Sequence, residues 1–191
     1  LPGGTSSSGF RPSVTMSRNM LPFEWVELFR YGFSPLVIKF ILLRFIHSNS
    51  FQKANGLIFL TNYAKEKISK IVNLENLNSV IIPHGVDFQK KHKSTIRDFS
   101  SFSAKNPCKL IYVSHISPYK HQPHVVKATS RLRDLGIPVS LVLIGPAESP
   151  ADALILNNLI KNTDPNEDFI FYLGELVNEE VINYYLDADI C

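Results

Sequence analysis

The sequence predicts an α/β fold built from doubly wound parallel sheets, and two observations support this. Short apolar runs without strict alternation, typical of strands covered on both faces, recur along the chain. Segments with helical periodicity lie between these runs, as expected for βαβ units. The predicted strands cover residues 13–16, 56–60, 79–83, 109–114, 139–145 and 169–174.

Capping residues and periodicity predict five helices. The clearest covers 123–135 and ends at Gly136, a residue type that commonly terminates helices. Thr61 is expected to cap a second helix, and Asn178 to cap the last one. The other two cover 35–46 and 150–162. The predicted buried faces consist of Val125, Ala128, Leu132 and Leu135 in the first, and of Val181, Ile182, Tyr185 and Leu186 in the last.

A polar stretch divides this pattern in two. It is rich in Lys and Ser and lacks a sustained apolar period. We therefore predict one α/β domain over 1–84, a linker over 85–107 and a second domain over 108–191. The first residue is not Met, and a new strand begins where the chain stops, so we expect both domains to be incomplete.

Length and charge limit the classes of function. The chain has 191 residues, enough for one or two domains with hydrophobic cores. Its net charge is only +3, and no basic block is interleaved with aromatic residues, so we expect no nucleic-acid partner. Cys108 and Cys191 lack metal-ligand spacing and favour a reduced, cytoplasmic protein without a bound metal. The opening residues have no signal-peptide pattern.

The longest apolar run, residues 35–46, raises the question of a membrane. Lys39 and Arg44 interrupt it, and it is shorter than the ~20 residues that span a bilayer. With its flanks it forms the segment 34–53, which mixes bulky apolar and basic side chains as interfacial helices do. The simpler interpretation, which we prefer from sequence, is a helix packed on the N-terminal sheet. Peripheral contact with the inner face of a membrane is the alternative.

The turn after the strand 109–114 is the strongest candidate for a binding site. It reads YVSHISPYKHQP and gathers Ser114, His115, Ser117 and Lys120 before a predicted helix. Ligands of doubly wound sheets bind at the carboxyl ends of the strands, and helix N-termini favour anions. Lys120 at such a position suits a phosphate or diphosphate. Solvated surface residues in an ordinary turn are the alternative.

Three weaker features follow other strands. His84 and Gly85 lie where a strand turns into the linker, a position that structure alone explains. Gly145 would let a ligand approach the backbone, although a plain turn explains it equally well. The backbone from Gly174 to Val177, before the last helix, could contact the edge of a nucleobase.

In this order, these pieces resemble the retaining glycosyltransferases of family 4, which have the GT-B fold of two Rossmann-like domains. The family pattern is V-x-N/H-G-V-D, then V-G-R-L followed by K-G, then L-x-I/V-G-x-G, and finally G-x-V before Y-x-x-A-D. The chain offers IIPHGVD, YVSHISPYKHQ, LVLIGPA and YLGELVNEEVINYYLDADI. NMLPFE and GLIFLTNYAKEKI also resemble the end of the family's N-terminal domain, so the resemblance runs from about residue 12 onward.

The resemblance implies roles for the residues of the turn. Lys120 matches the lysine that holds the donor diphosphate, which makes it the expected catalytic residue, and Ser114 and His115 lie beside it. His115 stands where the family has Arg, and a neutral His donates one hydrogen bond where Arg binds bidentately. Lys120 then neutralises more of the charge, or His115 acts in its protonated form. The residues expected to line the nucleotide pocket are Gly145, Gly174, Leu176 and Val177.

On the acceptor side of the cleft, the resemblance points to Gly3, Gly4, Arg18 and Asn19. Arg18 or Asn19 falls near the family's cleft histidine, and neither can replace it unchanged. The family's Glu-x7-Glu pair is expected shortly after Ile190, beyond the residues of this sequence.

The implied function is transfer of a sugar from a UDP- or GDP-linked donor to a saccharide or lipid-linked acceptor with retention, without a cofactor or metal. The setting would be assembly of cell-surface polysaccharide or glycolipid, and the 191 residues alone are expected to be inactive. Two alternatives remain open: a nucleotide-sugar 2-epimerase of the same architecture, and a non-enzymatic α/β module that binds a phosphorylated ligand.

Overall fold

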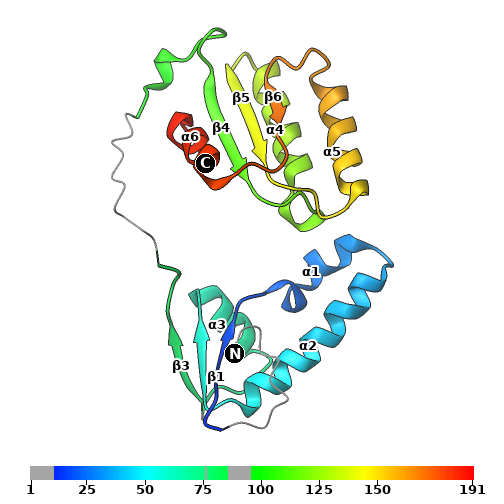
Figure 1. Cartoon of the computed structure of the whole chain (residues 1–191), viewed down its shortest axis with the longest axis vertical. Coiled ribbons are helices and arrows are strands. Elements are labelled where there is room, and N and C mark those ends of the chain that lie inside the picture. Colours follow the sequence, from blue (N-terminus) through cyan, green and yellow to red (C-terminus); the bar gives the residue numbers. More distant parts are fainter. Residues whose placement is uncertain (1–10, 76, 86–95) are drawn as a thin grey trace. The chain divides into compact units, whose positions relative to one another are not determined.

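The computed structural model describes residues 11–75, 77–85 and 96–191 of the chain. The chain forms two compact units, Leu1–Gln89 and Lys90–Cys191, called unit 1 and unit 2 below. Each unit contains a three-stranded parallel sheet with helices packed on it (Figure 1). The predicted α/β class and the parallel strand direction are therefore confirmed.

The sheet of unit 1 has the strand order β1-β2-β3. Its strands are β1 (Val14–Ser17), β2 (Gly56–Phe59) and β3 (Asn78–Ile81). The helices are η1 (Leu21–Phe23), α1 (Trp25–Leu28), η2 (Phe29–Tyr31), α2 (Pro35–Lys53) and α3 (Asn62–Ser69). Phe51, Leu57, Phe59 and Ile68 are fully buried and form the centre of its core.

Two helices of unit 1 follow the sequence signals closely. Thr61 caps α3 as predicted, since its hydroxyl accepts a hydrogen bond of 3.1 Å from the Ala64 N–H. Helix α2 begins at Pro35, as predicted, but continues to Lys53 instead of ending at residue 46. The additional turns contain Phe51, which is buried against the sheet, so tertiary packing extends the helix beyond the apolar run.

The sheet of unit 2 has the strand order β4-β5-β6. Its strands are β4 (Cys108–Val113), β5 (Val139–Ile144) and β6 (Ile170–Tyr172). The helices are η3 (Phe99–Ser101), η4 (Pro118–Lys120), α4 (Gln122–Asp134), α5 (Pro150–Thr163) and α6 (Asn178–Asp187). The chain then returns to the free edge of β4, where Ile190 forms a parallel bridge with Leu110. This return makes the unit doubly wound, with β4 between the two halves.

The predicted buried face of α4 is right only in part: Val125 packs against the core of unit 2 and Leu132 is partly buried. The buried residues of this helix are Gln122, Val126 and Thr129, whereas Ala128 and Leu135 are exposed. Both buried polar side chains donate to backbone carbonyls: Gln122 Nε2 to His115 O at 2.7 Å and Thr129 Oγ1 to Val125 O at 2.9 Å. A pattern based on apolar residues alone misses these two polar positions, because hydrogen bonding lets polar residues be buried there. Gly136 does terminate the helix, with φ of +79°.

The last helix also differs from its prediction. Asn178 is the first residue of α6, and the N-cap is Val177, whose side chain makes no capping hydrogen bond. Of the predicted face, Val181 and Ile182 are partly buried, while Tyr185 and Leu186 are largely exposed.

Part of the predicted linker is packed onto unit 2. Residues 86–95 lie outside the described ranges, but 96–107 contain η3 and a bridge between Ser103 and Asn106. Arg97 anchors this segment, because its guanidinium pairs with the Asp189 carboxylate (Nε to Oδ1, 2.7 Å) and donates to the Pro107 carbonyl at 3.0 Å. This ion pair lowers the pKa of Asp189 below its usual value.

Candidate functional site

The carboxyl end of β4 is the point at which the strand order of unit 2 reverses. Strand β5 pairs with one edge of β4, and Ile190 pairs with the other edge. In doubly wound sheets, ligands bind outside the carboxyl ends of the strands at such a point. The turn that leaves β4 contains Ser114, His115 and Lys120, so the residues predicted to bind a diphosphate lie at this point.

Backbone hydrogen bonds hold the three loops at this edge together beyond the strand ends. Ser114 N donates to Ile144 O at 2.9 Å, and Ile116 N donates to Pro146 O at 2.9 Å. Gly145 N donates to Gly174 O at 2.7 Å, which ties the β5 loop to the β6 loop. The predicted diphosphate residues and two predicted nucleotide-pocket glycines, Gly145 and Gly174, therefore belong to one connected framework.

Two tyrosine hydroxyls support the same framework from within the unit. Tyr112 Oη donates to the Lys120 carbonyl at 2.7 Å, and Tyr172 Oη donates to the Gly145 carbonyl at 3.0 Å. Burial raises the pKa of both phenols, so each remains a protonated donor at neutral pH. Both contacts fix the main chain of a predicted site residue, and the one at Lys120 does not use the Lys120 ammonium.

Lys120 ends the single turn η4 just before α4. Its N–H donates to Ser117 O at 3.0 Å, and its ammonium lies 5.2 Å from the centre of the Tyr119 ring. The side chain is partly buried, and it forms no ion pair within the described residues. Its charge is therefore available to an anion.

No acidic or capping side chain neutralises the positive end of the α4 helix dipole. The N-cap is His121, which has the left-handed conformation (φ 62°) and makes no side-chain capping bond. No acidic residue lies in the first turn. The second residue of α4 is Pro123, which has no N–H, and the His124 N–H donates to the His121 carbonyl at 2.9 Å. The contribution of α4 to anion binding is therefore mainly its unneutralised dipole. His115 is exposed beside this turn, and Ser114 is partly buried.

The segment from Gly174 to Val177 connects β6 to α6. Gly174 has φ of +70°, a conformation that suits glycine, and Leu176 is partly buried whereas Val177 is 60% exposed. Glu179 and Glu180 occupy the first turn of α6 and compensate its positive end. The N-terminus of α6 is therefore less suited to an anion than that of α4.

Unit 1 contains the predicted acceptor-side residues that the structure describes. Arg18 and Asn19 follow β1 and are both exposed. Asn19 Oδ1 accepts from Leu21 N at 3.0 Å, a local turn contact that explains its residue type structurally. Gly3 and Gly4 lie outside the described residues. The roles of all four residues stay predictions.

The structure brings together a polar cluster in unit 1 that sequence reasoning missed. Tyr63, in the first turn of α3, donates through its hydroxyl to Glu24 Oε1, and Lys67 Nζ donates to Glu24 Oε2 at 3.1 Å. The bond to Glu24 is the main reason that the pKa of Lys67 is raised. The sequence gives little signal for this cluster, because Glu24 lies 39 residues from Tyr63.

The described residues contain no group of three or more His, Cys, Asp and Glu side chains arranged to hold a metal ion. Charge at the β4–α4 turn comes from Lys120 and from the backbone. This arrangement can bind a diphosphate and stabilise the charge that develops on it as a leaving group.

Comparison with known proteins agrees with this description of the fold. The family model for group 1 glycosyl transferases matches residues 93–191, more than half of the chain. The chain therefore belongs to the group 1 glycosyl transferases. No curated protein sequence matches it.

Solved structures show the fold across both units. HepE of Anabaena, in complex with UDP and glucose, has a TM-score of 0.68 at 17% identity over 94% of this chain. Sucrose-phosphate synthase from Thermosynechococcus elongatus has a TM-score of 0.67 at 16% identity over 93% of this chain. Trehalose 6-phosphate synthase from Burkholderia multivorans has a TM-score of 0.55 at 14% identity over 92% of this chain. The architecture is that of the GT-B glycosyltransferases, and the chain spans 45%, 43% and 49% of these proteins.

Proposed function

We propose that unit 2 binds the diphosphate of a UDP- or GDP-linked sugar, and that the complete protein transfers this sugar to a saccharide or lipid-linked acceptor. The observation that carries the proposal is the position of Lys120 and the uncapped start of α4, at the carboxyl end of β4 where the strand order reverses. A cation beside the positive end of a helix dipole suits a diphosphate.

Each residue of the turn has a proposed role. The Lys120 ammonium stabilises the negative charge that develops on the departing nucleoside diphosphate, and the positive end of the α4 dipole favours the same charge. The exposed His115 imidazole and the Ser114 hydroxyl add further hydrogen bonds to the phosphate oxygens. Because the backbone around Lys120 and His115 is held by Tyr112 and Gln122, these groups are positioned before the ligand binds.

The proposed nucleotide pocket uses the neighbouring loops. Gly145 lets the end of β5 lie directly against the Ser114 carbonyl, which brings the β5 loop up to the β4–α4 turn that would hold the diphosphate. Leu176 and Val177 would contact the base and ribose through apolar and main-chain groups. HepE was solved with UDP and glucose, which supports testing a UDP-linked donor first.

The remaining parts of the proposal rest on the motifs described above. We propose that transfer retains the anomeric configuration, that no cofactor or metal takes part, and that the reaction serves cell-surface polysaccharide or glycolipid assembly in the cytoplasm. The anomeric proton coupling of a purified product, compared with that of the donor, tests retention directly.

Titration calorimetry of the purified chain with UDP, GDP and ADP tests the proposed site. We expect one diphosphate to bind measurably and the corresponding nucleoside to bind much more weakly, because the diphosphate makes most of the contacts. Equal binding of uridine and UDP, or of guanosine and GDP, would remove the diphosphate from the proposal. Absence of binding by all three nucleotides would remove the donor site from unit 2.

A further inference from the structure

The solvent face of α2 is apolar. Val37, His47 and Phe51 are buried on one side of this helix. The opposite side presents Ile38, Leu42, Phe45 and Ile46, which recur at helical spacing and are between 49% and 68% exposed. A helix that packs on a sheet by one face normally carries polar residues on the other face. Helix α2 therefore has a second apolar face that the described part of unit 1 leaves uncovered.

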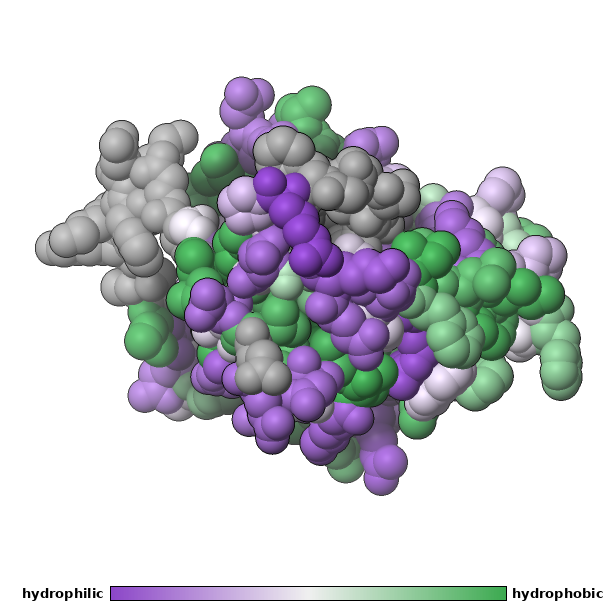
Figure 2. Space-filling view, turned by 90° about the horizontal axis from the view of Figure 1, so that it is seen from below, coloured by the Kyte–Doolittle hydropathy of each residue, from purple (hydrophilic) through white to green (hydrophobic). Residues whose placement is uncertain are grey.

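The preceding helices extend this face. Val26 is 72% exposed, Phe29 is 59% exposed, and Phe33, at the connection to α2, is fully exposed. In Figure 2, hydrophobic residues gather on the side of the molecule where α1 and α2 meet. We use the name hairpin surface for the exposed apolar side chains of this region. They are Trp25, Val26, Phe29, Phe33, Ile38, Leu42, Phe45 and Ile46.

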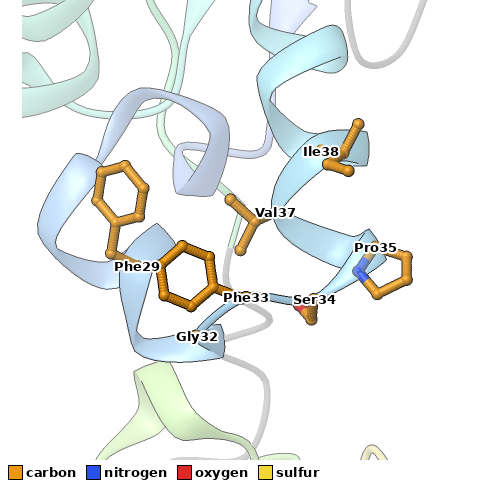
Figure 3. Close-up of a pocket in the computed structure, with 7 residues that line it drawn as sticks. All are labelled: Phe29, Gly32, Phe33, Ser34, Pro35, Val37 and Ile38. Carbon is orange, nitrogen blue, oxygen red and sulfur yellow. The ribbon is translucent and has the colours of Figure 1, made fainter.

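A pocket opens within the hairpin surface at the start of α2. Phe29, Phe33, Val37 and Ile38 line it, and its volume is about 560 Å³ (Figure 3). The Ser34 hydroxyl also belongs to the lining, and it is buried without a hydrogen-bond partner among the described residues. An apolar pocket of this size accommodates part of a hydrocarbon chain.

The charges of α2 are of one sign, whereas the two acidic residues of the preceding segment, Glu24 and Glu27, are paired with Lys67 and Arg30. Helix α2 contains no acidic residue, and its basic residues are Lys39, Arg44 and Lys53. Lys39 and Lys53 are exposed, and neither forms an ion pair within the described residues.

The third basic residue of α2, Arg44, makes its contacts within unit 1. Its guanidinium lies 4.7 Å from the centre of the Trp25 ring and donates to the Pro22 carbonyl at 3.2 Å. This contact packs α2 against the segment that precedes it, so the two parts of the hairpin surface belong to one rigid element.

We propose that the hairpin surface docks on an anionic phospholipid bilayer. Bulky apolar residues with basic residues at their border are the composition of helices that lie in the membrane interface. Phe33 and Phe45 would enter the boundary between headgroups and acyl chains, and Lys39 and Lys53 would lie near the lipid phosphates. The proposed contact is with the surface of the bilayer. None of the helices in the described ranges is long and apolar enough to cross a bilayer.

This inference goes beyond the proposed function and does not depend on it. It concerns unit 1, whereas the proposed nucleotide site lies in unit 2. Nucleotide binding can therefore be measured on every variant below, and the two proposals can fail separately.

The sole tryptophan of the chain provides a direct probe, because Trp25 belongs to the hairpin surface. We expect the chain to sediment with vesicles of equal parts phosphatidylglycerol and phosphatidylcholine. Trp25 emission should shift to shorter wavelength as the ring leaves water. With vesicles of phosphatidylcholine alone, binding should be at least about fivefold weaker, since each basic residue near an anionic surface favours binding by roughly that factor.

Matched variants locate the contact. The double variant Phe33→Ser/Phe45→Ser should reduce binding to the anionic vesicles about tenfold or more, because two exposed aromatic rings are removed. Its control is Ile96→Ser/Phe99→Ser in unit 2, whose side chains are 96% and 76% exposed and should leave binding within about twofold. The charge variant Lys39→Glu/Lys53→Glu should also lose about tenfold or more, and its control is Lys105→Glu/Lys127→Glu.

Three outcomes would overturn the proposal. One is equal binding to the neutral and anionic vesicles, and another is an equal loss of binding in the hairpin and control variants. The third is absence of vesicle binding together with a dimer in analytical ultracentrifugation that Phe33→Ser/Phe45→Ser dissociates, which would assign the hairpin surface to self-association. Circular dichroism of each variant checks that the fold is retained.

Discussion

Gly145 approaches the Ser114 carbonyl so closely that a β-carbon at position 145 would lie 2.2 Å from that oxygen. The φ angle of Gly145 is +137°, which also disfavours any other residue. This contact joins the ends of β4 and β5, where the turn with His115 and Lys120 begins. Glycine is therefore required here for the backbone structure, whether or not a nucleotide lies against it.

For this reason we expect Gly145→Ala to destabilise unit 2 by about 3 kcal/mol or more, because the backbone of one strand end must move. Nucleotide binding should fall with it. The free energy of unfolding, measured by urea denaturation with circular dichroism, checks the first effect. Gly136→Ala is a useful comparison, since its φ is also positive but no atom lies within 4 Å of the added carbon. If Gly145→Ala costs no more than Gly136→Ala, the close approach has no energetic importance.

Lys120→Ala should weaken diphosphate binding by about tenfold or more and leave the thermal stability nearly unchanged. The ammonium supplies charge to the ligand, while the fold uses only the Lys120 backbone groups. In the complete enzyme, turnover should fall more than tenfold. Calorimetry with the preferred nucleotide is the measurement, and Lys127→Ala, on the exposed side of α4, is the control. Wild-type affinity in Lys120→Ala would assign the diphosphate to other residues.

Asp164 is a structural residue in the loop between α5 and β6. It is 2% exposed, and its carboxylate accepts hydrogen bonds from the N–H groups of Asp168 (3.0 Å), Phe169 (2.8 Å) and Ile170 (2.8 Å). Asp164→Ala leaves these donors without a partner, so we expect a loss of about 2–4 kcal/mol in the unfolding free energy. Amide hydrogen exchange at Phe169 and Ile170 should accelerate. The exposed Asp168→Ala serves as control, and equal stability of the two variants would contradict the assignment.

His47 should make the stability of unit 1 sensitive to acid. Its side chain is buried beside Phe23 and Phe51, and burial lowers its pKa below the ordinary value of 6.5. When the pH falls below that value, the unfolded chain takes up the proton first, so the unfolding free energy decreases until the folded pKa is passed. Above the ordinary value both states are neutral, and the contribution is constant.

Trp25 fluorescence reports on unit 1 alone, because it is the only tryptophan. Urea midpoints at about pH 7.5 and about pH 5.5 should differ in the wild type, and His47→Leu should reduce this difference. His84→Leu, at an exposed position, should not reduce it. A pH dependence that is identical in both variants would exclude His47 as its source.

Local signals predicted the elements of the fold well. Every predicted strand lies within two residues of an observed one at each end, because apolar runs bounded by turn residues carry that information. The parallel direction followed from the helices between the strands. Errors arose where a buried position is polar, as at Gln122 and Thr129, and where packing prolonged a helix, as at Phe51.

The candidate site was predicted only in part for a related reason. Its central residue, Lys120, follows a strand and precedes a helix, so its position at the sheet edge could be inferred. The supporting contacts from Tyr112 and Tyr172, and the clusters of Arg97 with Asp189 and of Glu24 with Tyr63, join residues that no local pattern connects.

By itself, the sequence determined the order of the strands and of the five longer helices, the turn that carries Lys120 and the resemblance to glycosyltransferases, since these depend on spacing along the chain. Only the tertiary structure decided which helix faces are covered, which polar groups meet and which apolar residues of α2 stay exposed. Burial and hydrogen bonding depend on segments brought together from distant parts of the chain, and a one-dimensional pattern does not contain that proximity.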